Sequence, residues 1–393
     1  MPWKEVSTMT QKIQLLADWH SKLFTVTDLS HKYDIQRNTV YKWLERYEAF
    51  GVDGLKERSR APHRHPNQTP DDVVAMIVAQ KLKKRKRGPK KVIARLKEQH
   101  PDIVWPSPST ASDWLKKHGL VGAKKKRSTV PPYTEPFKDC HEPNASWSAD
   151  YKGQFYTRNG RICYPLTISD NYSRYLLACT GLPGPRYHET RAIFETVFRE
   201  YGLPDVIRTD NGTPFAGKCI GGLSRLAIWW IQLGIMPERI DKGRPQQNSR
   251  HERMHRTMDD EALEHIAPAM KEQQREFDFF RTDYNDDRPH EALGQKTPAS
   301  VYKKSPRPFV EKPVAPEYDH GYTVRQVRSS GDIKLNGNRY FLTELLEGHY
   351  VGLKAVSDEL WQIYYSFYPL GFIDIKKNKV LRTKKKVFTM CPV

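Results

Sequence analysis

The sequence predicts a multidomain chain with N-terminal all-α units, a central α/β domain built on a mixed sheet, and a small C-terminal β-barrel. Three observations lead to this prediction. Apolar residues recur at helical spacing in residues 9–50 and again in residues 69–125. Strand-like and helix-like segments then alternate from residue 144 to about residue 302. Finally, apolar and polar residues alternate in the manner of strands from residue 322 to about residue 375.

Composition points to a nucleic-acid partner for the first third of the chain. The 393 residues are 38% hydrophobic, which is enough for several cores. The net charge is +19, and residues 1–130 contain 27 Lys and Arg against 13 Asp and Glu. This uneven distribution favours a DNA-binding arm over a uniformly basic surface.

The cysteines and the apolar segments argue against an extracellular or membrane protein. Five scattered cysteines form no Cys-x-x-Cys pair, which disfavours a disulfide scaffold or a zinc site and indicates a reducing compartment. No signal peptide is recognisable, and the longest apolar run, residues 226–236, is too short to span a bilayer. We therefore expect no membrane partner and a bacterial, cytoplasmic, nucleoid-associated protein.

Residues 1–55 predict a helix-turn-helix DNA-binding domain. Three short helices are expected, the second beginning at Thr25 or Thr27 and the third running from Asn38 or Thr39 to just before Gly51. In this motif the last helix enters the major groove by its N-terminal end. A plain three-helix bundle is the alternative, because such bundles are common. The predicted DNA contacts are Arg37, Asn38, Thr39, Tyr41 and Lys42.

A basic linker, residues 56–68, leads to a second helix-turn-helix-like DNA-binding domain in residues 69–125. Residues 81–91, KLKKRKRGPKK, contain eight basic side chains. Such a run is usually a solvated face, but its place in a helical unit and the KKKR at 124–127 favour phosphate contacts. The predicted contacts are Lys83, Lys84, Arg85, Lys86, Arg87 and Lys90.

After a linker at 126–143, residues 144–305 form the predicted α/β domain. Its expected strands are 145–155, 163–168, 174–179, 206–210 and 236–240, and its expected helices are 188–201, 223–233 and 246–266. This order gives a mixed sheet. A linker at 306–320 precedes residues 321–393, where an Asn336-Gly337 hairpin turn and alternating strands predict the small β-barrel with a basic tail.

Three acids stand out in the central domain. Asp150 lies within a strand of apolar neighbours, where an unpaired carboxylate is costly. Asp210 ends a second buried strand just before a turn, and Glu252 lies early in the long helix. Each acid alone is more often structural than functional. Together, acids from two strands and one helix can converge on a pair of hard divalent ions, which would make all three metal ligands.

Such a site performs in-line displacement at phosphorus, first by water and then by a DNA 3′-hydroxyl. Polar residues near the acids are candidate DNA contacts, although Asn211 fits the stabilisation of a turn equally well and His255 and Arg256 fit plain exposure on a helix. These candidates are Asn211, Asn248, Arg250, His255 and Arg256.

Several motifs together resemble the integrase-core (DDE) transposases of bacterial insertion sequences, which are relatives of retroviral integrases. They are WSADY at 147–151, RTDNGTPF at 208–215, GRPQQNSRHERMHR at 243–256, YNDDRPHEAL at 284–293 and TPASVY at 297–302. The resemblance covers nearly the whole chain, since these proteins also carry N-terminal helix-turn-helix units. It implies a ribonuclease-H-like catalytic core, two Mg²⁺ or Mn²⁺ ions at Asp150, Asp210 and Glu252, and DNA cleavage with strand transfer.

The chain departs from the family at two places and lacks one retroviral feature. Ser249 replaces the usual glycine, and the stretch between Asp210 and Glu252 is longer than usual. Unlike retroviral integrases, the chain has no His-His-Cys-Cys zinc module. We expect a transposase that binds element ends and target DNA, both double-stranded, as a homo-oligomer. The alternatives are a DNA-binding regulator derived from a transposase and a nuclease that only hydrolyses DNA.

Overall fold

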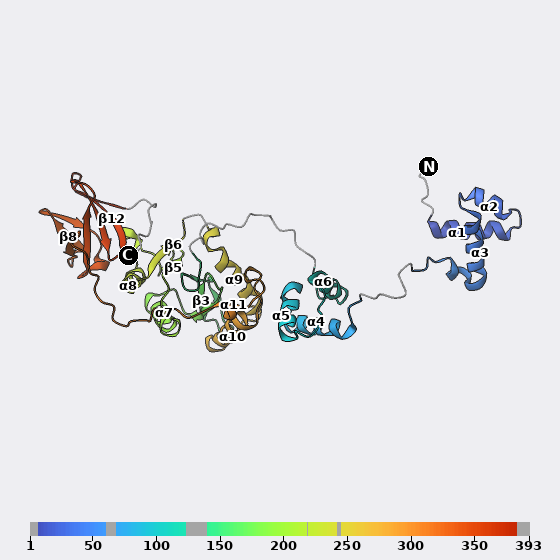
Figure 1. Ribbon diagram of the computed structural model, residues 1–393, viewed down its shortest axis with the longest axis horizontal. Helices are drawn as coiled ribbons and strands as arrows, with labels where there is room; N and C mark the ends of the chain where they lie inside the picture. Colours follow the sequence, from blue (N-terminus) through green and yellow to red (C-terminus); the bar gives the residue numbers. More distant parts are fainter. Residues whose placement is uncertain (1–6, 60–67, 123–139, 218, 242–244, 383–393) are drawn as a thin grey trace. The chain divides into compact units, whose positions relative to one another are not determined.

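The computed structural model describes residues 7–59, 68–122, 140–217, 219–241 and 245–382 (Figure 1). They fall into two compact units, Met1–Thr69 and Pro70–Val393, each of which is described by itself. Across these ranges, every helix is too short or too polar to traverse a lipid bilayer.

The first unit is a three-helix bundle that ends in a short 3-10 helix. Its elements are α1 (Thr8–His20), α2 (Val26–Lys32), α3 (Arg37–Phe50) and η1 (Gly51–Leu55). Thr25 starts α2 with a capping box, in which its Oγ1 accepts from the backbone N–H of Asp28 and the Asp28 carboxylate accepts from the N–H of Thr25. Leu29 and Val40 are fully buried between the helices. The three predicted helices are confirmed, with α3 starting slightly earlier than expected.

The second unit begins with another three-helix bundle. It consists of α4 (Asp71–Lys83), α5 (Pro89–Gln99) and α6 (Pro108–Lys117). Ser107 caps α6 by accepting a hydrogen bond from the backbone N–H of Thr110. Ile77, Ala111 and Leu115 are completely buried where the three helices meet, so this bundle has a core of its own.

A six-stranded mixed sheet forms the centre of the second unit. Its strands are β1 (Ser146–Tyr151), β2 (Phe155–Tyr156), β3 (Ile162–Asp170), β4 (Leu176–Leu182), β5 (Val206–Thr209) and β6 (Met236–Arg239). β3 pairs antiparallel with β1, β2 and β4, whereas β1, β5 and β6 are parallel. The intervening helices are α7 (Tyr187–Tyr201), α8 (Arg225–Gln232) and α9 (Ser249–Glu261). The order is the predicted one except that the expected strand 145–155 is two strands, β1 and the short β2.

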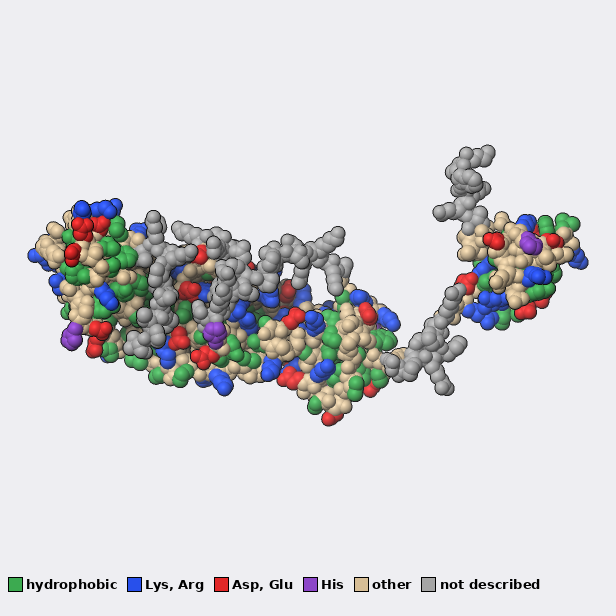
Figure 2. Space-filling model, turned by 45° about the horizontal axis from the view of Figure 1, so that its top comes forward, with side chains coloured by type: hydrophobic (Ala, Val, Ile, Leu, Met, Phe, Trp, Pro, Cys, Tyr) green, Lys and Arg blue, Asp and Glu red, His purple; other side chains and the backbone are tan. Residues whose placement is uncertain are grey.

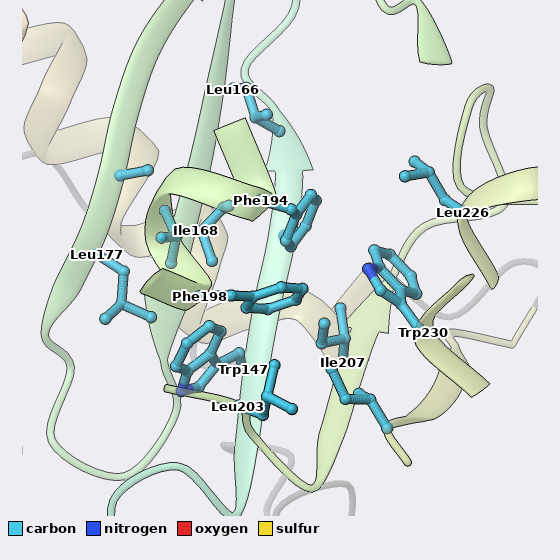
Figure 3. Close-up of a cluster of buried hydrophobic side chains, with 14 of the residues drawn as sticks. Trp147, Leu166, Ile168, Leu177, Phe194, Phe198, Leu203, Ile207, Leu226 and Trp230 are labelled. Atoms are coloured by element: carbon cyan, nitrogen blue, oxygen red, sulfur yellow. The ribbon is translucent and has the colours of Figure 1, made fainter. Parts of the chain in front are cut away.

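Apolar cores cover both faces of the sheet. Residues alternate along β1, so Trp147 packs against Phe198 of α7, in the same core in which Phe194 of α7 packs against Trp230 of α8 (Figure 3). The core on the other side joins the sheet to α9 and to α10 (Met270–Thr282). Asp150 and Ser148, which alternate with Trp147, therefore face the α9 side.

The C-terminal part is an open sheet rather than a closed barrel. Its strands are β7 (Thr323–Gln326), β8 (Asp332–Leu335), β9 (Asn338–Phe341), β10 (Tyr350–Ala355), β11 (Leu360–Tyr365), β12 (Tyr368–Asp374) and β13 (Lys379–Arg382). Five of them pair in the order β13-β12-β11-β10-β7, and β8-β9 is a separate hairpin closed by Asn336-Gly337, both at positive φ. Within the described residues no pairing joins β13 to β7, so the expected small β-barrel is not supported.

One face of the open C-terminal sheet is covered by α8 of the central domain. Ile228 and Ile231 of α8 share one apolar core with Ile363, Tyr365 and Leu370. The Tyr368 hydroxyl also donates a 3.2 Å hydrogen bond to the carbonyl of Gly221. The C-terminal sheet is thus packed directly against the central domain.

Candidate active site and DNA-binding residues

Asp150 and Asp210 lie beside each other at one edge of the central sheet. Ala149 of β1 pairs with Thr209 of β5 in parallel register, and each aspartate is the next residue along its chain. Parallel strands end at the same edge of a sheet. The register therefore brings together two carboxylates that are far apart in the sequence.

The turn after β5 holds the Asp210 carboxylate in place. The backbone N–H of Gly212 donates to its Oδ1 at 3.0 Å. A Cβ on residue 212 would lie 2.8 Å from Oδ2 of the same carboxylate, so a larger side chain would displace it. The Asn211 amide donates at 2.9 Å to the carbonyl of Ile240. This bond supports the turn-stabilising role for Asn211 that the sequence left open.

The third acid lies on α9, which is shorter than the predicted helix 246–266. A 3-10 turn, η4 (Pro245–Asn248), precedes α9, which ends at Glu261. Asn248 donates from Nδ2 to Oδ2 of Asp150 at 3.0 Å, and Glu252 lies one helical turn beyond Asn248. Ser249 begins the helix without a positive φ, so the departure from glycine is accommodated there.

Electrostatics link the three acids. The pKa of Asp150 rises from 3.8 to about 7, foremost because the group is buried and next because of the negative charge of Asp210. Glu252 adds a smaller repulsion, and hydrogen bonds from Asn248 and from the backbone of Tyr151 only partly oppose these effects. Asp210 and Glu252 thus lie near enough to disfavour the charge of Asp150.

The donor set fits a hard divalent cation, although the side chains are not arranged around one. In the described part of the chain, no three His, Cys, Asp or Glu side chains form a group that could hold a metal ion. Carboxylate oxygens are nevertheless the ligands that Mg²⁺ and Mn²⁺ prefer. A cation would also relieve the repulsion at Asp150, at the cost of turning the carboxylates toward it.

Two histidines of α9 hold the helix to the sheet behind the acids. Thr167, which pairs with Asp150 across β1 and β3, has its Oγ1 2.7 Å from Nε2 of His251 and 2.8 Å from Nε2 of His255. Burial lowers the pKa of His255 to about 3 and that of His251 far below its usual value, so both rings are neutral. The only signal for His251 in the sequence is its i,i+4 spacing from His255 beside Glu252.

Three predicted DNA contacts near the acids differ in accessibility. His255 is only 8% exposed and bonded to Thr167, so the predicted DNA contact does not fit it. Arg250 is partly buried and donates to the carbonyl of Asn171 at 2.7 Å. Arg256 is exposed and remains available.

The predicted recognition helix of the first unit presents an exposed N-terminal end. Arg37, Asn38, Tyr41 and Lys42 are exposed on α3, and Thr39 is partly buried. This is the accessibility that a major-groove contact requires.

The basic run 81–91 is less accessible than its composition suggests. Lys83, Arg85 and Lys86 are exposed. Lys90 is exposed too, and it pairs with Glu291, as Lys86 does with Glu264. Lys84 pairs with Asp283, and Arg87 pairs with both Asp283 and Asp287 of the central domain. Arg87 is 1% exposed, so a phosphate contact does not fit it. On the face seen in Figure 2, basic and acidic side chains are interspersed.

Family models match four parts of the chain. Two models described as an integrase core domain match residues 140–245 and 233–298. A helix-turn-helix domain matches residues 11–63, and a homeodomain-like domain matches residues 39–115.

Solved integrases show weak structural similarity to the chain. The HTLV-2 integrase catalytic core domain in complex with magnesium, in its trimeric form, has a TM-score of 0.34 and 14% identity, over 42% of this chain and 99% of that one. A chain of the simian T-cell lymphotropic virus intasome in complex with PP2A regulatory subunit B56 gamma has a TM-score of 0.37 and 16% identity, over 67% of this chain and 90% of that one.

Relatives occur in insertion elements and retroviruses. An uncharacterized 31.7 kDa protein of insertion element IS407 from Burkholderia multivorans is 28% identical over 47% of this chain and 64% of its own length. An uncharacterized 39.2 kDa protein of IS476 from Xanthomonas euvesicatoria is 29% identical over 40% of this chain and 44% of its own. The Gag-Pol polyprotein of baboon endogenous virus is 29% identical over 30% of this chain and 6% of its own length.

The chain spans about two thirds of the IS407 protein and less than half of the IS476 protein. Even so, the integrase-core matches, the helix-turn-helix matches and these relatives agree with one another. Residues 140–298 therefore match the integrase core domain, and the chain resembles insertion-sequence transposases, which are related to retroviral integrases.

Proposed function

We propose that this protein binds the terminal repeats of a mobile DNA element and catalyses metal-dependent DNA cleavage and strand transfer. Asp150, Asp210 and Glu252 are the proposed catalytic carboxylates and metal ligands. The observation that carries the proposal is the parallel register of β1 and β5, which places Asp150 beside Asp210, with Asn248 at the start of α9 bonded to Asp150. The raised pKa of Asp150, to which burial and the charges of Asp210 and Glu252 contribute, agrees with it. A buried carboxyl beside other acids is costly to ionise unless a cation offsets its charge.

The surrounding residues have roles that fit this chemistry. Asn248 holds the Asp150 carboxylate, and the backbone N–H of Gly212 holds that of Asp210. The neutral His251 and His255 fix α9, and with it Glu252, against Thr167. Two Mg²⁺ or Mn²⁺ ions bound here would neutralise charge on the attacking and leaving oxygens of a phosphodiester.

End recognition is assigned to the N-terminal units. The helix-turn-helix match and the exposed end of α3 support major-groove contacts by Arg37, Asn38, Tyr41 and Lys42. Lys83, Arg85, Arg256 and Lys86, all exposed, are proposed phosphate contacts, although Lys86 would have to leave its ion pair with Glu264. We infer that the chain acts as a homo-oligomer on paired ends and target DNA, at the nucleoid of a bacterial cytoplasm.

The test compares Asp210→Asn with Asp260→Asn, which makes the same change at an exposed carboxylate of α9. Each full-length protein is incubated with Mg²⁺ and labelled end fragments of its own element. We expect the unaltered chain and Asp260→Asn to nick and join the ends, and Asp210→Asn to bind them without forming product. Undiminished joining by Asp210→Asn would overturn the assignment. Specific binding by the unaltered chain without cleavage would favour the DNA-binding regulator.

A further inference from the structure

The basic run 81–91 makes a buried contact with the central domain through Arg87. Its guanidinium donates to Oδ2 of Asp283 and to Oδ2 of Asp287, each at 2.7 Å, and to the backbone carbonyl of Asp287 at 3.0 Å. The Arg87 side chain is 1% exposed and that of Asp283 is 9% exposed. A planar guanidinium that reaches two carboxylates from a buried position has a fixed geometry.

Both partners of Arg87 are shaped for this contact. α10 continues into a π-helical turn, η5 (Asp283–Asp287), which presents its first and last residues to the same guanidinium. On the other side, Lys81 donates to the carbonyl of Arg87 at 2.8 Å and so holds the backbone that carries it. The backbone that carries Arg87 and the backbone that carries Asp283 and Asp287 are therefore both held in place for this contact.

Further ion pairs surround this centre. Arg95 of α5 lies 2.6 Å from Oδ1 of Asp287, and Lys84 pairs with Asp283. Burial alone would raise the pKa of Asp287, but Arg87 and Arg95 outweigh it and keep that pKa below its usual value. The Asp287 carboxylate is thus ionised, and the charge of Arg87 is already paired without DNA.

The contact fixes more than one side chain, because α6 follows it rigidly. Val92, Ile93 and Leu96 of α5 share one apolar core with Ala111 and Leu115 of α6. Holding α5 on the central domain therefore also sets the direction of α6, the last helix of the bundle, and in a helix-turn-helix the last helix is the one that enters the major groove.

We propose that Arg87 is a positioning residue: bound between Asp283 and Asp287, it clamps the α4–α6 bundle to the catalytic core and so sets the distance from the bound DNA end to the cleaved phosphodiester. This inference rests on the proposed function for its consequence, although the clamp itself does not depend on DNA. A basic run is usually expected to bind DNA through all of its side chains. In this run, the buried Arg87 sets the position of the bundle, and its exposed neighbours contribute to the affinity for DNA.

The test compares Arg87→Gln with Arg85→Gln, which removes the same charge two residues away at an exposed side chain. Hydrogen exchange of the backbone in residues 283–291 is measured without DNA. The positions of nicks on labelled end fragments are then mapped with Mg²⁺. Arg87→Lys keeps the charge without the two-pronged geometry and should restore nick position only in part.

For Arg87→Gln we expect faster exchange in residues 283–291, an end affinity within about threefold of the unaltered chain, and nicks spread over several neighbouring phosphodiesters. Arg85→Gln should show unchanged exchange, weaker binding and a single nick position. A merely stabilising role would lower the amount of product and leave its position unchanged, so unchanged nick positions with Arg87→Gln would overturn the proposal. Unchanged exchange in that variant would also overturn it.

Two further measurements decide the question if Arg87→Gln does not fold or if no DNA is cut. If Arg87→Gln does not fold, Asp287→Asn weakens one side of the same clamp and should show the same two changes. If the unaltered chain cuts no end fragment, the proposed function fails, but the exchange experiment still decides whether the clamp exists.

Discussion

Removing the charge of Asp150 should stabilise the metal-free protein at alkaline pH. The Asp150 carboxyl has a pKa of about 7 in the folded chain against a usual value of 3.8. Each pKa unit corresponds to about 1.4 kcal/mol, so ionising this group costs the folded state at most about 4 kcal/mol. Since relaxation and water entry offset part of the cost of burial, and salt screens the part that comes from Asp210 and Glu252, we expect about half of that, roughly 2 kcal/mol. Asp150→Asn cannot ionise, and its amide oxygen can still accept from Asn248.

The raised pKa of Asp150 determines how this stability difference changes with pH. A carboxyl whose pKa is raised on folding destabilises the folded state fully above pH 7, and this penalty fades as the pH falls to 3.8. In EDTA at pH 8, Asp150→Asn should therefore melt higher by about 4 to 8 °C, since a domain of this size gains roughly 2 to 4 °C per kcal/mol. The gain should shrink steadily toward pH 4.

Calorimetry of the full chain measures this difference at each pH, with Asp260→Asn as the matched control. Mg²⁺ should raise the melting temperature of the unaltered chain and leave that of Asp150→Asn nearly unchanged. If Asp150→Asn is no more stable than the unaltered chain at pH 8 in EDTA, burial and the charges of Asp210 and Glu252 do not disfavour the ionised Asp150 as described.

Three other predictions concern the residues around the acids and the DNA. Gly212→Ala places a Cβ 2.8 Å from the Asp210 carboxylate, so Mg²⁺-dependent nicking should fall by about 10- to 100-fold with end binding retained. Gly88→Ala, where no atom lies within 4 Å, is its control, and equal nicking rates for the two would refute the effect. Thr167→Val leaves His251 and His255 without their shared hydroxyl and should lower the free energy of unfolding by roughly 2 kcal/mol in urea titrations; an unchanged midpoint would contradict this. End affinity should fall linearly with salt on logarithmic axes, and fluorescence anisotropy that shows no salt dependence would exclude phosphate contacts by the basic residues.

The order of elements in the central domain could be predicted because the spacing of apolar residues within each segment distinguishes a strand from a helix. Short apolar segments gave the buried strands, and an amphipathic repeat gave α7. The ends were less certain: the predicted helix 246–266 proved to be a 3-10 turn followed by α9, Ser249–Glu261. Hydrophobic period alone does not separate a 3-10 turn from the start of an α-helix.

Closure of the C-terminal sheet could not be predicted from alternation. Whether β13 meets β7 depends on the tilt and stagger of all strands, which no single segment encodes. The sequence did contain one overlooked signal. Residues 226–231 of α8 are all buried, and a helix that is apolar on every side needs a partner on every side. The C-terminal sheet covers the face that the central sheet leaves open.

Accessibility of the basic and polar candidates could not be predicted either. The sequence shows that Arg87 lies in a basic run, but its partners are 196 and 200 residues away. His255 shares a helix with Glu252, yet its contact with Thr167 depends on how α9 crosses the sheet. In both cases residue type and spacing indicated that the side chain makes a polar contact. Only the folded structure showed that its partner is another part of the protein.

Direct counting of bound Mn²⁺ tests the central claim that Asp150, Asp210 and Glu252 together hold divalent ions. Electron paramagnetic resonance would count the bound ions in the full chain with end DNA. We predict about two ions per chain for the unaltered protein and for Asp260→Asn, and loss of both in Asp210→Asn. An equal number of ions bound by Asp210→Asn would contradict the account.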